Sequence, residues 1–508
     1  MKSYLRYEPK HQFGVITSPQ CNVQYDYTGN LAFTGAIQDV CVWNLRQASL
    51  VGNIDSIKLT FDEPSYPYRT GGDVSIIQSN PCKPLVAVGY TNGIIRVFNY
   101  LNQTLLATLK GHRSMVASLC FEEDGVTLAS GGNDCDIVLW DLVSFTAICR
   151  LRGHKDGVTG ISFLCTQTQP RQQLLVSVSK DTLLKVWDLE TQCCVQTIVG
   201  HRCEIWSLAV LPRISTDGNN CTPIVITGAA DELLRGYRLS STGSSKSEED
   251  STEEGSQNIL EHYGSLERQQ AGAGGIDKCA SLSFNAAGNL LAAQSSGKTI
   301  ELFRIRDAAE AKKKCKRRQK RTDGKKTVDT VEGSTAAADG QAFHTSQLVL
   351  SDEVEALPSH TIRCTGRVRG FAFDHSAVTA ENKTSSSKHA HICKALVSQI
   401  NNSLEIYQLT CPSSTTEADE DSLPSKLSVI DLHGHRGDVR GVALSGDGNT
   451  VATCSAESVK VWSSRTHLCL GTSRVEGYCL CVAFAPGGRY IIAGTKEGFV
   501  QVHTFIVI

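Results

Sequence analysis

The sequence is poor in features that would point to particular classes of protein. Among 508 residues there are 13 prolines, 2 methionines and 5 tryptophans. No uninterrupted apolar run reaches the roughly 18 residues that a membrane-spanning helix needs. The 50 lysines and arginines nearly balance the 52 aspartates and glutamates, which gives a net charge of −2. We therefore expect no membrane partner, and the overall charge does not indicate a partner of one sign.

Motifs of catalysis and metal binding are also missing. The sequence contains no phosphate-binding GxxxxGK[ST] loop, no HExxH and no GxSxG. Its 20 cysteines include no CxxC pair, and the adjacent Cys193 and Cys194 do not resemble a zinc site. Many cysteines lie inside apolar strand patterns, where a thiol behaves as a small hydrophobic residue. We expect reduced thiols, no metal, no cofactor, no small-molecule substrate and no enzymatic activity.

What the sequence does contain is a repeated unit, which is clearest at residues 151–190. Gly153-His154 opens it, two alternating apolar runs follow, Asp181 stands four residues after Ser177, and Trp187 stands six after Asp181. Alternation with a period of two predicts half-buried strands. A buried histidine and a buried indole N–H both need hydrogen-bond partners. The spacing therefore predicts a hydrogen-bonded set of four side chains that fastens the unit internally.

Copies of this unit recur along the chain, with an aromatic residue or its substitute at the end of one strand. Around Trp462 the turn residue Glu457 stands one residue too close, which leaves that set in doubt. Complete sets are predicted in three copies: His112, Ser130, Asp134 and Trp140; His154, Ser177, Asp181 and Trp187; His201, Thr227, Asp231 and Tyr237.

These repeats resemble those of WD-repeat proteins, which implies an all-β fold, a WD-repeat β-propeller. A period of about 40–45 residues is typical of one propeller blade. Nine copies exceed the 4–8 blades of most propellers. We therefore predict a seven-bladed first ring plus the first two blades of an incomplete second ring. The alternative is one eight-bladed ring in which the first and ninth copies share strands. Residues 13–16 are predicted to add a strand that closes the first ring.

Shifts in composition predict the domain boundaries. The first propeller is expected over residues 1–410, an acidic linker over 411–427 and the two further blades over 428–508. Polar stretches that cannot bury enough apolar surface are expected to be disordered insertions at 240–275, 307–346 and 374–391.

One of these insertions carries a dense run of positive charge at residues 311–326. Such a run is typical of a nuclear address or of a contact with RNA phosphates, and the alternative is a solvated helical spur. Its ten cations are Lys312, Lys313, Lys314, Lys316, Arg317, Arg318, Lys320, Arg321, Lys325 and Lys326.

Longer segments resemble one family of WD-repeat proteins, the eukaryotic nucleolar subunits of the small-subunit processome in its UTP-B subcomplex. They are YLRY (4–7), FGVI (13–16), GHKDGVTGISF (153–163), GHRGDVRGVALS (434–445) and GTKEGFVQV (494–502). The resemblance implies a non-catalytic nucleolar scaffold for pre-rRNA processing and small ribosomal subunit biogenesis. Its implied partners are other WD-repeat subunits of the processome, pre-rRNA and small nucleolar RNA. Against that family, the chain is expected to be truncated before a helical C-terminal domain.

A second hypothesis is a substrate receptor of a cullin-type ubiquitin ligase. Such propellers often carry Trp-Asp-x-Arg after a strand. Here Trp140-Asp141-Leu142-Val143 lacks the arginine, and Trp43-Asn44-Leu45-Arg46 lacks the aspartate. The motif therefore favours this alternative only weakly.

Overall fold

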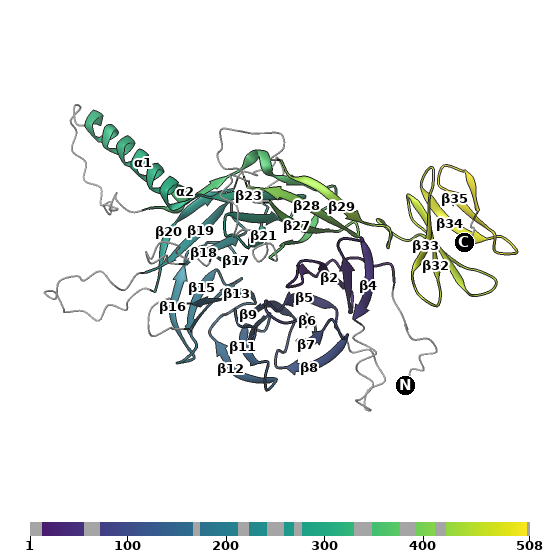
Figure 1. Cartoon of the computed structure of the whole chain (residues 1–508), viewed down its shortest axis with the longest axis horizontal. Coiled ribbons are helices and arrows are strands. Elements are labelled where there is room, and N and C mark those ends of the chain that lie inside the picture. The colour runs from purple at the N-terminus through teal and green to yellow at the C-terminus, as the bar shows by residue number, and fades with distance from the viewer. Residues whose placement is uncertain are drawn as a thin grey trace, which may run out of the picture.

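The chain folds into consecutive antiparallel β-sheets, nine of them within the residues that the structure describes (Figure 1). A computed structural model describes residues 13–54, 72–165, 173–211, 223–240, 259–268, 277–329, 348–375, 392–411 and 423–504. Seven sheets make a closed ring, and two more follow at the C-terminal side of the chain. The predicted all-β propeller of seven blades plus two further sheets is therefore confirmed.

Each of the first four sheets of the ring is a meander of four strands in chain order. Their strands are β1 (Val23–Tyr25), β2 (Leu31–Ala36), β3 (Asp39–Asn44) and β4 (Ser49–Ile54); β5 (Val74–Ser79), β6 (Leu85–Tyr90), β7 (Ile94–Asn99) and β8 (Thr104–Lys110); β9 (Val116–Phe121), β10 (Thr127–Gly132), β11 (Asp136–Asp141) and β12 (Thr146–Arg152); β13 (Val158–Cys165), β14 (Gln173–Ser179), β15 (Leu183–Asp188) and β16 (Cys193–Val199).

The sixth sheet differs from the other six because two short strands, β24 and β25, share the edge of β23. The strands of sheets five to seven are β17 (Ile205–Leu211), β18 (Ile224–Ala229), β19 (Leu233–Leu239) and β20 (Leu260–Glu267); β21 (Cys279–Phe284), β22 (Leu290–Ser295), β23 (Thr299–Ile305), β24 (Val354–Ala356) and β25 (Ile362–Arg363); β26 (Val368–Phe373), β27 (Ile392–Gln399), β28 (Ser403–Thr410) and β29 (Ser425–Ile430).

Two sheets follow the ring and pack against each other. Their strands are β30 (Gly441–Leu444), β31 (Thr450–Cys454), β32 (Ser458–Ser463) and β33 (Cys469–Arg474); β34 (Cys479–Phe484), β35 (Tyr490–Thr495) and β36 (Val500–Thr504). A cluster that includes Cys454, Val461, Cys479 and Ile491 fills the space between them. The helical elements are α1 (Ala308–Asp329), α2 (Leu350–Glu353) and the single 3-10 turn η2 (Pro358–His360).

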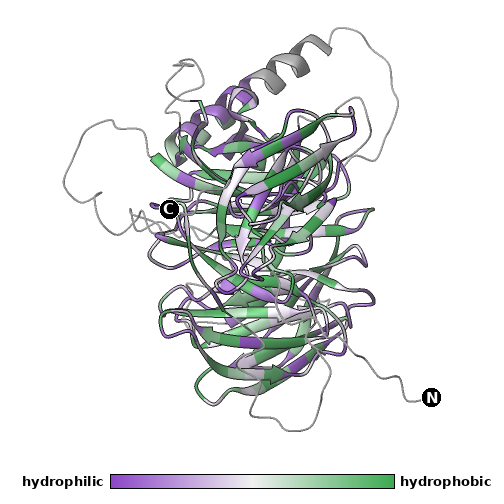
Figure 2. Ribbon diagram, turned by 90° about the vertical axis from the view of Figure 1, so that its right-hand side faces the viewer, coloured by the Kyte–Doolittle hydropathy of each residue, from purple (hydrophilic) through white to green (hydrophobic). Residues whose placement is uncertain are grey.

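The innermost strands define the ring. The first strand of each sheet contacts the first strand of the next, from β1 through β5, β9, β13, β17 and β21 to β26, and β26 contacts β1. Every neighbouring pair of sheets shares one apolar cluster, because alternating residues of each strand point to the two faces. Figure 2 shows hydrophobic residues along the strands and mostly hydrophilic ones on α1.

Three predicted boundaries differ from the structure. β20 lies inside the predicted insertion 240–275 and completes the fifth sheet by pairing with β19, and its Tyr263 and Leu266 join the apolar cluster between the fifth and sixth sheets. β29 overlaps the predicted linker 411–427 and completes the seventh sheet by pairing with β28. α1 lies inside the predicted insertion 307–346 and is helical. Most of the insertion predicted at 374–391 lies outside the described residues.

The ring closes in a different way from the predicted one. Residues 13–16 form no strand, and the first and seventh sheets are each built from strands consecutive in the chain. The Asn402 side chain, in the turn between β27 and β28, holds this segment instead. Its Oδ1 accepts the N–H of Ile16 at 2.6 Å and of Thr17 at 3.2 Å, and its Nδ2 donates to the Gly14 carbonyl at 2.8 Å. The same Nδ2 lies 3.1 Å from the His435 carbonyl.

Asn402→Gly should therefore destabilise the chain. Asn402 has a φ of 56°, which glycine adopts without strain, so the variant isolates the effect of the side-chain hydrogen bonds. We expect a decrease of about 1–3 kcal/mol in unfolding free energy, because amides of the 14–17 segment no longer have their acceptor. Urea unfolding measures this, with Asn401→Ala as the matched control in the same turn. An equal or larger decrease in the control would contradict the role of Asn402.

Candidate functional site

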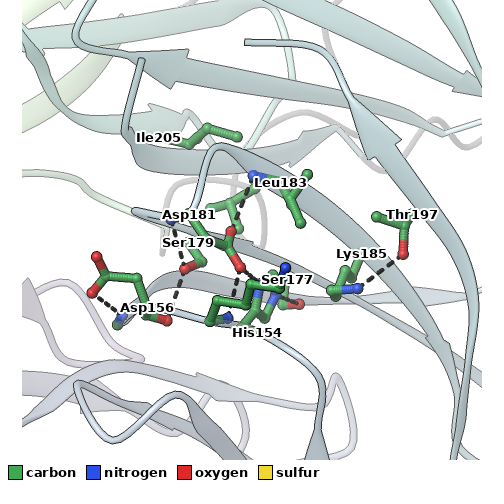
Figure 3. Close-up of polar contacts among 12 residues, drawn as sticks. His154, Asp156, Ser177, Ser179, Asp181, Leu183, Lys185, Thr197 and Ile205 are labelled. Carbon is green, nitrogen blue, oxygen red and sulfur yellow. Dashed lines mark hydrogen bonds and ion pairs between the residues drawn. The ribbon is translucent and has the colours of Figure 1, made fainter. Parts of the chain in front are cut away.

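The fourth sheet contains a continuous chain of hydrogen bonds between four side chains, of which Figure 3 shows His154, Ser177 and Asp181. Ser177, on β14, lies between two rings: the Trp187 indole N–H donates to its hydroxyl at 2.8 Å, and the hydroxyl lies 2.8 Å from Nε2 of His154. Nδ1 of His154 lies 2.9 Å from a carboxylate oxygen of Asp181, which also accepts the Lys155 amide N–H. The structure thus brings together all four residues predicted for this unit.

Gly153, the residue before this histidine, is required by the same arrangement. A Cβ at Gly153 would lie 3.0 Å from the edge of the Trp187 ring. Glycine therefore lets the indole lie against the backbone, which explains why Gly precedes His in the unit.

The third sheet repeats the geometry. His112 lies 2.8 Å from the Ser130 hydroxyl through Nε2 and 2.9 Å from Asp134 through Nδ1, and the Trp140 indole donates to Ser130 at 2.8 Å. The His112 side chain is completely buried. The four predicted residues are again in one hydrogen-bonded chain.

In the fifth sheet the aromatic position is changed. His201 reaches Thr227 at 2.8 Å and Asp231 at 3.1 Å, as predicted. Tyr237 replaces the tryptophan and is 1% exposed. Burial raises the pKa of its phenol above the usual range, so Tyr237 stays neutral. Its ring packs in the apolar cluster between the fourth and fifth sheets.

The protonation states of the histidines and aspartates in these sets favour a structural role over a catalytic one. Burial lowers the pKa of His154 and of His201. The neighbouring aspartates, Asp181 and Asp231, raise these pKa values, but burial has the larger effect. Burial raises the pKa of Asp181, but the hydrogen bonds from Lys155 and His154 outweigh it, so the pKa is lowered. At neutral pH a neutral imidazole therefore donates to a carboxylate. Because the His154 side chain is fully buried, it has no access to a substrate, and the set acts as an internal fastening.

Two further sheets carry incomplete versions of the set. In the first sheet the Trp43 indole donates to the Thr34 hydroxyl at 2.8 Å, and that hydroxyl donates to the Ile16 carbonyl at 2.6 Å. The backbone of the N-terminal segment thus takes the place of the missing histidine. The repeat pattern does not predict this substitution, because a backbone carbonyl leaves no signature in the sequence.

The eighth sheet keeps three of the four positions. The Thr453 hydroxyl lies 2.7 Å from both Nε2 of His435 and the Trp462 indole nitrogen. Nδ1 of His435 lies 3.4 Å from the hydroxyl of Ser458, the first residue of β32. Ser458 follows the shortened turn that carries Glu457, and its hydroxyl takes the position of the aspartate in the other sets. Burial, together with the charge of Lys460, lowers the pKa of His435 to about 4, so no carboxylate is needed to keep its ring neutral and bonded.

Five cations of the predicted basic run lie on the solvent-facing side of α1. Ala311 and Cys315 are buried on one side of the helix, at the i, i+4 spacing of one helical face. On the other side the exposed cations are Lys312, Lys313, Lys316, Arg317 and Lys320, which we call the α1 basic face.

Two of the ten predicted cations hold the helix in place. Lys314 Nζ donates to the Ser351 carbonyl at 2.8 Å, and Arg318 lies 2.9 Å from the buried Asp352 carboxylate of α2. These two cations are therefore paired with α2, whereas the sequence predicted that all ten were available for targeting or RNA contact. Arg321, Lys325 and Lys326 continue the same helix, and their side chains lie outside the part of the chain that the structure describes in detail.

α2 anchors this assembly to the ring. Leu350 is fully buried and belongs to the apolar cluster between the fifth and sixth sheets. A Cβ at Gly236 of β19 would lie 2.7 Å from the Leu350 side chain. The α1 basic face is therefore held at a fixed place on the rim of the ring.

Other kinds of site are not indicated in the described ranges. Among those residues, no group of three or more His, Cys, Asp or Glu could hold a metal ion. The cysteines whose side chains the structure describes form no disulfide bond. In the same ranges, no helix combines the length and the apolar character that crossing a membrane requires.

Ser177→Ala tests the internal fastening. Removal of the hydroxyl takes away the acceptor of the Trp187 N–H and the partner of His154 Nε2, and we expect a cost of about 1–3 kcal/mol of unfolding free energy. Urea unfolding measures it. Ser162→Ala, on the neighbouring strand β13, removes a hydroxyl that bonds weakly to the Phe163 carbonyl at 3.4 Å and also contacts the Cys120 thiol, and should cost less than Ser177→Ala. An equal decrease in unfolding free energy for the two variants would show that Ser177 does not link Trp187 to His154 in a stabilising way.

Comparisons with known proteins agree with this architecture. Residues 30–239 match the family described as the WDR3 first beta-propeller domain, and residues 426–463 match the WD domain, G-beta repeat. The chain is 29% identical over 513 aligned residues to U3 small nucleolar RNA-associated protein 12 of Saccharomyces cerevisiae, covering 99% of this chain and 48% of that protein.

A second relative covers a smaller part. WD repeat-containing protein 3 of Homo sapiens is 30% identical over 229 residues, or 45% of this chain and 22% of that protein. Among solved structures, the RRP9 WD40 repeats match with a TM-score of 0.48 and 14% identity, covering 77% of this chain and 88% of that one.

The chain thus spans about half the length of the yeast relative. The part of this chain that aligns with the relative includes all nine sheets described above. The repeats, the seven-sheet ring and the match to the first propeller agree with one another: the chain is a WD-repeat protein similar to WDR3.

Proposed function

We propose that the chain is a non-catalytic scaffold of the small-subunit processome, acting in pre-rRNA processing and small ribosomal subunit biogenesis in the nucleolus. The observation that carries the proposal is the similarity over 99% of the chain to a yeast protein named for its association with U3 small nucleolar RNA. The buried histidine–aspartate pairs support a structural role for the residues that most resemble catalytic ones. The proposed partners are other WD-repeat subunits of the processome, pre-rRNA and small nucleolar RNA.

Co-purification from eukaryotic cells tests the proposal. The tagged chain should enrich U3 small nucleolar RNA and nucleolar WD-repeat proteins, as read by RNA sequencing and mass spectrometry. A matched control is a chain carrying Leu350→Asp, which places a charge in the cluster between the fifth and sixth sheets and disrupts the ring. Enrichment of a cullin ligase adaptor without nucleolar proteins would instead support a substrate receptor of a ubiquitin ligase.

The α1 basic face is the proposed contact with RNA or with a nuclear import receptor. Its five exposed cations lie on one side of a helix that is anchored through the other side. Five charges in three turns attract phosphates, and their effect on binding depends on salt. Lys314 and Arg318 are left out of this surface because α2 already pairs them.

Replacing the five cations of the α1 basic face with glutamine should weaken binding to a single-stranded RNA. The plot of log affinity against log salt should become flatter by about 0.7 for each phosphate that the variant no longer neutralises. Fluorescence anisotropy at several salt concentrations measures this, and imaging of the same variant measures nuclear accumulation. A control that exchanges lysine and arginine at the five positions keeps the charge and should behave as the parent chain. Unchanged RNA affinity together with unchanged nuclear accumulation would contradict both roles.

A further inference from the structure

Trp206 occupies an unusual position near the centre of the ring. It is the second residue of β17, the innermost strand of the fifth sheet, and it is half-buried. Most neighbours in that strand face apolar clusters, but the indole meets two lysines from the adjoining sheets. Neither the repeat pattern nor the proposed scaffold role accounts for this group.

Three consecutive sheets contribute to the group. The ammonium of Lys278, which precedes β21 of the sixth sheet, lies 3.4 Å from the centroid of the Trp206 ring. The ammonium of Lys180, in the turn between β14 and β15 of the fourth sheet, lies 5.0 Å from the same centroid. An indole face attracts cations through its quadrupole. The Trp206 indole therefore contacts two like charges.

Backbone hydrogen bonds fix the segments that carry these lysines. The Lys180 amide donates to the Gly157 carbonyl at 3.1 Å, and the Lys278 carbonyl accepts the Ser296 amide at 3.1 Å. Both lysines are half-buried. The backbone at both lysines is therefore fixed before any ligand arrives, which lowers part of the ordering cost of binding.

The two lysines and the indole N–H offer an anion its partners. Burial lowers the pKa of Lys278, Lys180 lowers it further, and only Glu204 is opposed to these effects. In addition, the indole N–H of Trp206 is buried and has no acceptor among the described residues. A ligand with a negatively charged oxygen would relieve the repulsion between the lysines and supply an acceptor that the free protein lacks.

We propose that Trp206, Lys180 and Lys278 form a recognition site for the carboxylate of an aspartate or glutamate in a segment of a partner protein. The surrounding charge favours a protein over RNA. Three exposed acidic residues are near these lysines: Glu204 acts on the charge of Lys278, Asp277 precedes Lys278 in the chain, and the Asp156 carbonyl accepts the hydroxyl of Ser179, which precedes Lys180. A polyanion would place successive phosphates close to these groups, whereas a peptide can offer one carboxylate flanked by basic residues that complement them.

The inference does not rest on membership of the processome, since it concerns a local site that any partner with this chemistry would use. Its test uses the whole chain and two capped pentapeptides, acetyl-Arg-Ala-Glu-Ala-Arg-amide and the same peptide with glutamine at the centre. The readout is the nitrogen–proton NMR signal of the Trp206 indole, assigned as the signal that disappears in Trp206→Phe.

The glutamate peptide, at millimolar concentration, should shift this signal saturably, and the glutamine peptide should not. Lys278→Met and Lys180→Met keep the apolar stems but remove the charges, and each should raise the dissociation constant by about tenfold, as expected when one charge-assisted hydrogen bond is removed. Lys298→Met, which removes an exposed lysine from a turn of the sixth sheet, should leave it unchanged.

Three results would overturn the proposal. The first is no shift with either peptide or the same shift with both. The second is an unchanged dissociation constant in both lysine variants. The third is saturation of the Trp206 signal by a ten-nucleotide oligouridylate at a lower concentration than the glutamate peptide, which would make the site an RNA contact.

Discussion

Closure of the ring is the constraint on which the rest of the structure depends. A sheet in the ring buries apolar side chains on both faces, so each sheet needs a neighbour on either side. The last such contact joins the first sheet to the seventh, through a cluster that includes Trp43, Ile16, Leu396 and Ile430. Without it, both terminal sheets would expose a face.

The N-terminal segment and the turn at Asn402 meet at this junction. Ile16 is fully buried between the two sheets, and its amide and carbonyl are taken up by Asn402 and Thr34. The same segment extends to the eighth sheet, where Phe13 lies 5.3 Å from the ring of Trp462. Gly14 permits this approach, since a Cβ there would lie 3.0 Å from the same ring. One short segment thus joins the closure of the ring to the sheet that follows it.

The repeated polar side chains make their hydrogen bonds to one another within each sheet. In the third, fourth and fifth sheets every histidine of a set is held between a hydroxyl and a carboxylate. A buried network in which all partners are satisfied makes the fold rigid but offers no free group for chemistry. The two binding surfaces proposed above, the α1 basic face and the group around Trp206, both consist of residues that depart from the repeat.

The sequence contained enough information for the ring but not for its exceptions. His154, Ser177, Asp181 and Trp187 could be predicted because their spacing within one blade is fixed. β20 and β29 were missed because polar segments separate each from the strand it pairs with, which hides the hairpin. The pairing of Arg318 with Asp352 was missed because the partner lies beyond a long insertion and only the fold brings the two together.

Strand direction places the two proposed binding surfaces at opposite ends of the sixth sheet. Lys278 precedes β21, and Cys279 at the start of β21 pairs with Ser295 at the end of β22. β23 begins at that same end, at Thr299, and runs to Ile305 at the other end, where α1 follows. A partner bound through Trp206 and Lys278 would therefore not cover the α1 basic face. A scaffold needs this separation, because it must hold one ligand while it receives another.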